Sequence, residues 1–313
     1  MTPSLLSETT QQWITEAVGS GAVVRSVQVM PGSTSATLYA VEVEHAGHTL
    51  ELVLRLFTNA EWLAEEPDLA VHEAAALKKV AGAGIPTPEL VAVDETGAIC
   101  GVPAILMTRV PGAVDLTPAD FSSWLQRLAE PLGVIHAVSA DDFGWQFFAY
   151  NDVDRLSVPG WSRVPDLWAR ANAVVRGPAP DTPMCFIHRD YHPVNVLWQN
   201  GKISGIVDWP NACRGPLGAD LGHCRLNLAA MYGVNAADSF LRAYESLTGV
   251  GQHPYWDLRM LTDDWQPELE VYTPWAHFGL RHITTRLMGQ RLDDYLIRIM
   301  ARLWASRWRI LTS

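Results

Sequence analysis

The chain has 313 residues, of which 48% are hydrophobic and 18% charged, and its formal net charge is −11. This composition is typical of a globular protein and excludes a largely disordered one. The acidic balance and the lack of a Lys/Arg run argue against nucleic-acid binding. No apolar run approaches a membrane span and residues 1–20 do not resemble a signal peptide, so we expect a cytoplasmic protein with no membrane partner. Four scattered cysteines without a Cys-x-x-Cys pair favour reduced thiols over a disulfide framework or a zinc site.

The first hundred residues predict an antiparallel sheet that carries a helix. Ser7 is a candidate N-cap for a short first helix that ends at Gly19, and a second helix is expected over 71–81, before Gly82-Ala83-Gly84. Five strands are expected over 23–30, 37–44, 49–57, 89–94 and 104–108, with a turn at 45–48.

The composition then changes at Arg109-Val110-Pro111-Gly112, and the pattern becomes helical. Apolar residues recur with helical spacing from Phe121 to Ile135. Further helices are expected over 163–176, 217–231, 236–247 and from 273 to the C-terminus. The predicted fold class is therefore α+β, with a small lobe of sheet and helix (1–108), a hinge (109–113) and a larger, mainly helical lobe (114–313).

The most informative motif is His188-Arg189-Asp190-Tyr191-His192-Pro193-Val194-Asn195, which is followed by Ile206-Val207-Asp208-Trp209. Asn200-Gly201 between two apolar runs predicts a hairpin that brings the loop and Asp208 to one end of a β-ribbon. One carboxylate that accepts a hydroxyl proton, with an amide and a second carboxylate that hold magnesium, are the parts a phosphoryl-transfer site needs. The alternative is a polar surface hairpin with a capped Asp.

The stretch 188–219 resembles the aminoglycoside phosphotransferase family, small-molecule relatives of protein kinases that include choline and macrolide kinases. The likeness extends to a loop at 31–37, Val53-Leu54-Arg55, Glu73, residues 103–112 and His136. It implies a protein-kinase-like bilobal fold, ATP or GTP as phosphoryl donor and Mg²⁺ as cofactor. By the same resemblance Asp190 is the catalytic base, and Asn195 and Asp208 are the magnesium ligands. Trp209 stands where protein kinases have Phe-Gly.

Arg55 stands where protein kinases carry a phosphate-binding lysine. A guanidinium can hold phosphates through two hydrogen bonds and pair with a carboxylate, for which Glu73 is the first candidate and Glu65, Glu66 and Asp68 compete. If Arg55 faced solvent, the phosphate anchor would lie elsewhere. The other nucleotide-binding candidates are the small hydroxyl-bearing residues Ser33, Thr34 and Ser35, together with Met107, Thr108 and Val110 where the small lobe meets the hinge. By the same resemblance, the backbone of this second group would contact adenine.

Three further residues are expected to be structural. His188 orders the catalytic loop, Asp220 braces that loop by resemblance to the family's helix-start Asp, and His136 is a satisfied core histidine.

The resemblance also implies that the acceptor binds the helical lobe beside the catalytic loop. Carboxylates interleaved with aromatics suit a cationic polyol or amine, although thirteen tryptophans would also suit a large apolar acceptor, and a solvated acidic loop is the plain alternative. The candidate residues are Trp209, Asn211, Asp263, Asp264, Trp265, Glu268, Glu270 and Tyr272.

The sequence thus predicts a kinase that phosphorylates a hydroxyl of a small molecule, plausibly an antibiotic of the aminoglycoside or macrolide type, which would make it a resistance enzyme. The alternatives are a metabolic kinase for choline, an amino alcohol or a sugar amine, and a nucleotide-binding pseudokinase scaffold. The absence of an Ala-Pro-Glu segment after Asp208 disfavours a protein kinase. A monomer and a dimer are both compatible with the sequence.

Overall fold

The structure is a computed structural model that describes residues 5–30, 36–263 and 268–312. The chain divides into two compact units. The first comprises residues 1–111 and 204–212, and the second comprises 112–203 and 213–313. The segment that carries Asp208 therefore belongs to the first unit, whereas the lobe boundaries predicted from the sequence place it in the second. A functional hinge at 109–113 stays a prediction.

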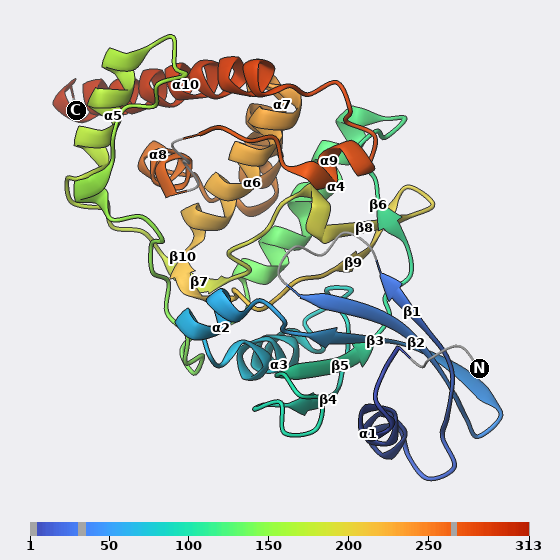
Figure 1. Cartoon of the computed structure of the whole chain (residues 1–313). Helices are drawn as coiled ribbons and strands as arrows, with labels where there is room; N and C mark the ends of the chain where they lie inside the picture. Colours follow the sequence, from blue (N-terminus) through green and yellow to red (C-terminus); the bar gives the residue numbers. More distant parts are fainter. Residues whose placement is uncertain (1–4, 31–35, 264–267, 313) are drawn as a thin grey trace. The chain divides into compact units, whose positions relative to one another are not determined.

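A five-stranded antiparallel sheet forms the centre of the first unit (Figure 1). All five predicted strands are present within one residue of their expected ends, and the strand order is β1-β2-β3-β5-β4. Ala46 and Gly47 both have positive φ, the twist that a two-residue hairpin requires, so β2 and β3 pair along their whole length. The strands are β1 (Val23–Met30), β2 (Thr37–His45), β3 (His48–Leu56), β4 (Leu90–Asp94) and β5 (Ala104–Thr108).

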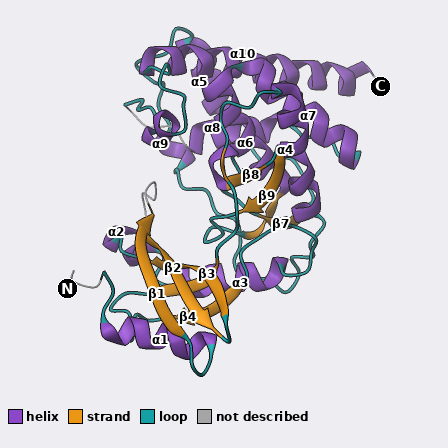
Figure 2. Ribbon diagram, turned by 90° about the vertical axis from the view of Figure 1, so that its right-hand side faces the viewer, coloured by secondary structure: helices purple, strands orange, loops and turns teal. Residues whose placement is uncertain are grey.

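Helices cover the two faces of this sheet. On one face lies α1 (Glu8–Val18) (Figure 2). Its Ile14 packs with Leu52 and Leu54 of β3, and the Ser7 hydroxyl caps the helix by accepting from a backbone N–H. Because side chains alternate along a strand, Arg55 points to the other face, where α3 (Leu69–Val80) lies. The sequence did not predict the short α2 (Ala60–Glu65), which Asn59 caps.

The second unit is built around one nearly fully buried helix, α6 (Leu217–Tyr232), which contacts α7, α8 and α10 (Figure 1). Gly218 and Gly222 permit close approach of α8, because a Cβ at either position would lie within 2.7 Å of Trp256. The surrounding helices are α4 (Phe121–His136), α5 (Pro165–Val175), α7 (Val234–Thr248), α8 (Pro254–Asp263), α9 (Thr273–His277) and α10 (Thr285–Thr312).

Two details of this helical region differ from the prediction. The expected helix from 273 onward is interrupted between α9 and α10, where Gly279 has a φ of 102° that a helix cannot accommodate. The helix α8, which ends at Asp263, was not predicted, because its residues carry no clean apolar stripe: all ten are buried.

Short strands flank the loop that carries Asp190. β7 (Met184–Ile187) pairs with β10 (Cys213–Pro216), and β6 (Ala113–Val114) pairs with β8 (Val196–Gln199). The predicted hairpin is present, since Asn200 and Gly201 both have positive φ and link β8 to β9 (Lys202–Ile206). Single 3₁₀ turns occur at Val153–Arg155 and at Pro193–Asn195.

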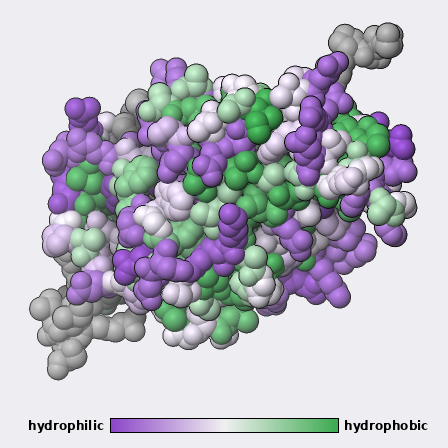
Figure 3. Space-filling model, turned by 90° about the horizontal axis from the view of Figure 1, so that it is seen from below, coloured by the Kyte–Doolittle hydropathy of each residue, from purple (hydrophilic) through white to green (hydrophobic). Residues whose placement is uncertain are grey.

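Hydrophobic and hydrophilic residues are interspersed on the face drawn in Figure 3, as on most globular proteins. Among the described helices, none combines the length and apolar character that spanning a bilayer requires.

Candidate active site

The loop that carries Asp190 is anchored to α6 by a buried carboxylate. Asp220 accepts hydrogen bonds from the backbone N–H groups of His188 and Arg189, and the His136 ring lies 3.2 Å from it. Asp220 is completely buried, so these bonds replace the water that its carboxylate has lost. The geometry is that of a structural brace.

Arg189 holds the loop in a conformation that few residues adopt. Its φ is 69°, in the left-handed region, immediately before Asp190. The guanidinium carbon lies 4.0 Å from the ring centre of Phe148 and 4.1 Å from that of Tyr150, and the side chain donates to the carbonyl of Phe148. These contacts offset the backbone strain, which proteins commonly keep at functional sites.

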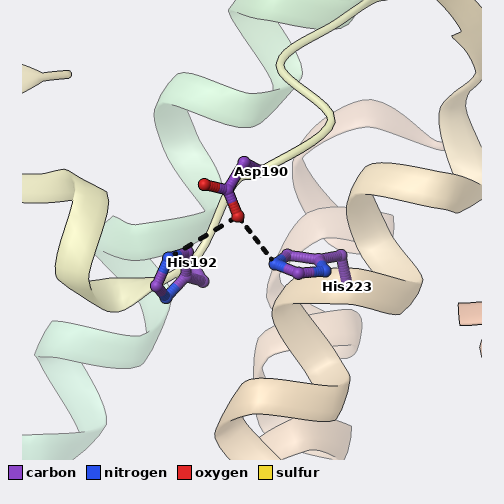
Figure 4. A group of neighbouring side chains, drawn as sticks. All are labelled: Asp190, His192 and His223. Atoms are coloured by element: carbon purple, nitrogen blue, oxygen red, sulfur yellow. Dashed lines mark ion pairs between the residues drawn. The ribbon is translucent and has the colours of Figure 1, made fainter. Parts of the chain in front are cut away.

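Two imidazoles converge on the Asp190 carboxylate (Figure 4). The Oδ1 atom lies 3.1 Å from Nε2 of His223 and 3.7 Å from Nε2 of His192. Burial would raise the pKa of Asp190, but His192, His223 and His188 together hold that pKa well below its ordinary value. Asp190 is therefore an ionised, oriented hydrogen-bond acceptor whose contribution depends on position more than on basicity.

His223 was not among the predicted site residues. It follows Asp220 by three positions on α6, and residues three apart lie on the same side of a helix. Once Asp220 is expected to brace the loop, His223 is the next side chain expected to face it, so the sequence did contain a signal.

Asn195 is hydrogen-bonded to Asp190. Its Nδ2 donates to the backbone oxygen of Asp190 at 2.9 Å and to Oδ2 of that residue at 3.0 Å. With the amide nitrogen engaged, the amide oxygen is the atom that Asn195 can offer to a cation.

In the first unit, Arg55 is buried between two carboxylates. Its Nη1 lies 3.0 Å from Glu73 and 2.7 Å from Asp208, and only 4% of the residue is exposed. Burial by itself would lower the pKa of Arg55, but Asp208 and Glu73 raise it above the ordinary value, so the guanidinium stays charged. Arg55 thus lies against Glu73, the partner first considered from the sequence, and does not face solvent.

Asp208, like Arg189, adopts positive φ, at 70°. Its Oδ1 accepts from Arg55, which leaves the second oxygen as a cation ligand. Carboxylate and amide oxygens are the ligands that Mg²⁺ prefers, so Asp208 and Asn195 fit the predicted ion chemically. The ligand atoms of Asp190, His192 and His223 also lie within 4.8 Å of one another, but imidazole nitrogens suit transition metals rather than Mg²⁺.

The predicted nucleotide contacts are only partly described. Ser33, Thr34 and Ser35 lie outside the described residues. Met107 is buried on β5, and Val110 follows the sheet half-buried. The Thr108 backbone N–H already donates to Glu89, so Thr108 cannot offer that group to adenine unless the bond breaks. The predicted contact of this stretch with adenine stays a prediction.

Three predicted acceptor residues, Glu268, Glu270 and Tyr272, line a cavity of about 860 Å³ together with Asp190. The structure thereby brings the predicted catalytic residue and part of the predicted substrate surface together within one unit. The cavity is also lined by residues that sequence reasoning did not identify: Trp161, Trp168, His192, His223, Leu226, Asn227, Ala230, Leu261, Leu269, Trp275, Met288 and Leu292.

The remaining predicted acceptor residues are placed differently. Trp209 is fully buried and its indole donates to Ile206, so it is part of the core rather than a surface that an acceptor can reach. Asp263 is also buried, where it accepts from the backbone of Asn151 and pairs with Arg259. Asn211 is half-buried in the first unit and does not line the cavity. Asp264 and Trp265 lie outside the described residues.

Comparison with known proteins agrees with this geometry. The sequence profile of the phosphotransferase enzyme family matches residues 26–259. A homoserine kinase of Methylocella silvestris is 30% identical over 172 residues, which are 47% of this chain and 50% of that protein. The chain thus spans about half the length of this curated relative.

Solved structures show the same fold. A ternary complex of a thermostable mutant of the aminoglycoside phosphotransferase APH(4)-Ia with ADP and hygromycin B matches with a TM-score of 0.60 and 18% identity, over 93% of this chain and 98% of that one. The macrolide 2'-phosphotransferase MphH from Brachybacterium faecium matches with a TM-score of 0.55 and 15% identity, over 81% and 87% of the two chains.

The fold is therefore that of the protein-kinase-like phosphotransferases, an α+β architecture as the sequence predicted. Because the family profile covers most of its length, the chain belongs to the phosphotransferase enzyme family.

Proposed function

We propose that this protein transfers a phosphoryl group from ATP or GTP to a hydroxyl of a small molecule. The observation that carries the proposal is the Asp190 carboxylate, which is bonded to Asn195 and lines a cavity large enough for an organic acceptor. A hydroxyl in that cavity would donate a hydrogen bond to Asp190, which would orient the oxygen for attack and accept its proton as the new bond forms.

Asn195 and Asp208 would hold Mg²⁺, which neutralises phosphate charge when bound. Arg55 keeps Asp208 in place through its 2.7 Å ion pair and is itself fixed by Glu73. The protein would therefore contribute pre-positioned charges rather than covalent chemistry.

Two acceptor classes remain candidates. An antibiotic acceptor, which the sequence predicts, is supported by the fold shared with proteins named aminoglycoside and macrolide phosphotransferases. A metabolic acceptor, such as an amino alcohol, is supported by relatives that are named homoserine kinases.

The test is a nucleotide-consumption screen with ATP and GTP over antibiotics, amino alcohols, choline and sugar amines. We expect turnover with Mg²⁺ and none in excess chelator. Asp208→Asn should abolish turnover, whereas Asp166→Asn, at an exposed position of α5, should leave it unchanged. Full activity in chelator, or wild-type turnover by Asp208→Asn, would contradict the proposed roles.

A further inference from the structure

The cavity beside Asp190 is large for a small metabolite. Its volume of about 860 Å³ falls within the range of roughly 300–1,000 Å³ that is usual for sites of drug-sized ligands. All of its lining residues belong to the second unit. An amino acid as small as homoserine would leave most of this space to water.

Part of the cavity lining is apolar. It is formed by Leu226 of α6, Leu261 of α8 and Leu292 of α10, each at most 7% exposed, together with Met288. Trp168 of α5 adds an aromatic surface, with Trp161 edge-on against it at 5.6 Å between ring centres. Such a wall gains free energy only from a ligand that has apolar surface of its own to bury.

The polar lining is mainly acidic. It contains the carboxylates of Asp190, Glu268 and Glu270 and the imidazoles of His192 and His223, which face Asp190, and among the described residues that line the cavity there is no Lys or Arg. Tyr272 adds an aromatic ring, edge-on to His192 at 6.5 Å between ring centres. Carboxylates and aromatic rings together favour a protonated amine over a neutral or anionic ligand.

Two tryptophans of the lining carry buried indole nitrogens. The indole nitrogens of Trp161 and Trp275 are buried, and within the described part of the chain neither has a hydrogen-bond partner.

We infer that the acceptor is a bulky hydroxylated amine with an extended apolar body, rather than a small amino acid or a wholly polar polyamine. Its hydroxyl meets Asp190, its ammonium lies near Glu268 and Glu270, and its apolar body fills the space between α5, α6, α8 and α10. This inference rests on the proposed function for the role of Asp190, but the size, charge and apolar wall of the cavity carry it independently.

The first experiment is a calorimetric binding assay without nucleotide. Four probes separate the ligand classes: erythromycin and quinine are hydroxylated amines with large apolar bodies, hygromycin B is a polar polyhydroxylated amine, and L-homoserine is a small amino acid. At least one of the two apolar-bodied amines should bind ten or more times as tightly as hygromycin B and homoserine.

A pair of substitutions within one helix localises the binding. Leu226 and Leu228 are both buried in α6, but only Leu226 lines the cavity. Leu226→Ala should raise the dissociation constant of the apolar amine about tenfold or more, because apolar contact with the ligand is lost. Leu228→Ala should leave that constant within twofold, even though both changes lower the melting temperature.

The outcomes are separable from those of the kinase test. An apolar amine that binds but is not phosphorylated by Mg²⁺-ATP or Mg²⁺-GTP supports the inferred ligand class and contradicts the proposed activity. Phosphorylation with homoserine or hygromycin B preferred supports the activity and overturns the inferred class. Failure of both apolar amines to bind, or equal effects of Leu226→Ala and Leu228→Ala, also overturns it.

Discussion

The two units differ in how the charged side chains of their candidate sites are paired. In the first unit, Arg55 lies between Glu73 and Asp208, so a buried cation is neutralised by carboxylates of the same unit. In the second, Asp190 meets two histidines at the wall of a cavity whose described lining holds three carboxylates and no Lys or Arg. In the first unit both carboxylates contact the same guanidinium, and Asp208 keeps one oxygen for a metal ion, whereas in the second unit Glu268 and Glu270 are exposed at the wall of a cavity that a cationic ligand can enter.

This difference indicates which part of the site is pre-formed. A buried ion pair whose members satisfy each other keeps its geometry, and removal of one member leaves an uncompensated charge. A partly exposed carboxylate on a cavity wall can exchange partners at low cost, which an acceptor-binding group must do in each catalytic cycle. Substitutions in the first unit should therefore affect stability as well as nucleotide use, and those in the second should affect turnover or acceptor affinity.

The largest effect is expected from Asp190→Ala. Loss of a positioned proton acceptor should lower kcat by about a hundredfold or more, with nucleotide KM within a few-fold of wild type. Steady-state kinetics with varied nucleotide measure both. Asp190→Asn keeps the shape but not the charge and should be similarly slow, whereas Asp166→Ala should behave as wild type. A parallel collapse of nucleotide affinity would instead assign Asp190 to the nucleotide or metal site.

The next largest effect is expected from Arg55→Ala, which leaves Glu73 as a buried charge without its counter-ion. Unfolding in urea should show a loss of about 3–5 kcal/mol, and the nucleotide KM should rise sharply. Arg55→Lys keeps the charge and should retain substantial activity. Arg25 forms an exposed ion pair with Glu44, so Arg25→Ala should cost no more than about 1 kcal/mol. Equal stability losses in the two Ala variants would show that the buried ion pair of Arg55 contributes no more to stability than an exposed one.

How much of this was predictable from sequence depends on how local each interaction is. The Asn200-Gly201 hairpin and the Ser7 cap were predicted because a few adjacent residues determine them. The break at Gly279 was missed, since a lone glycine in an apolar pattern does not reveal its φ. The burial of Trp209 was also missed, because aromatic residues occur both in cores and in binding sites.

The candidate site shows the same limit. Asp190 and Asn195 lie five residues apart on one loop, so their proximity follows from the motif. The apolar wall does not follow, because Trp161, Leu226 and Met288 come from distant segments and each reads as an ordinary core residue. The sequence therefore predicted part of the acidic lining of the cavity, namely Glu268 and Glu270, but none of its apolar lining.

A smaller effect is expected from neutralising the exposed carboxylates of the cavity. Glu268→Gln combined with Glu270→Gln should raise the KM of a cationic acceptor a few-fold and leave the nucleotide KM unchanged. The increase in acceptor KM should disappear in added salt, because salt screens exposed charges. Asp264, another predicted acceptor residue, lies outside the described residues. The matched control is the double change Glu61→Gln and Glu65→Gln on α2, which should alter neither KM. An unchanged acceptor KM at low salt would contradict the cationic class.

The smallest effect concerns one half-buried cysteine in each unit. Burial raises the pKa of Cys100 in the first unit to about 11 and that of Cys185 in the second to about 12. Both pKa values lie above the ordinary cysteine value of about 8.5. Over the pH range between the ordinary and the raised values, the folded protein therefore keeps thiol protons that the unfolded chain releases. Folded stability therefore falls as pH rises from about 8.5 towards these raised values.

At pH 8 the thiolate fraction of each cysteine is about a thousandth or less, so iodoacetamide should modify both slowly, and much faster in urea. Mass spectrometry of timed samples then reports the opening of each unit separately, with Cys100→Ser and Cys185→Ser as assignment controls. A bound acceptor stabilises only the state that binds it, so it should slow modification of Cys185 and leave Cys100 unaffected. Equal slowing at both cysteines would mean that the acceptor also stabilises the first unit. That result would contradict the expectation that the acceptor stabilises the second unit alone.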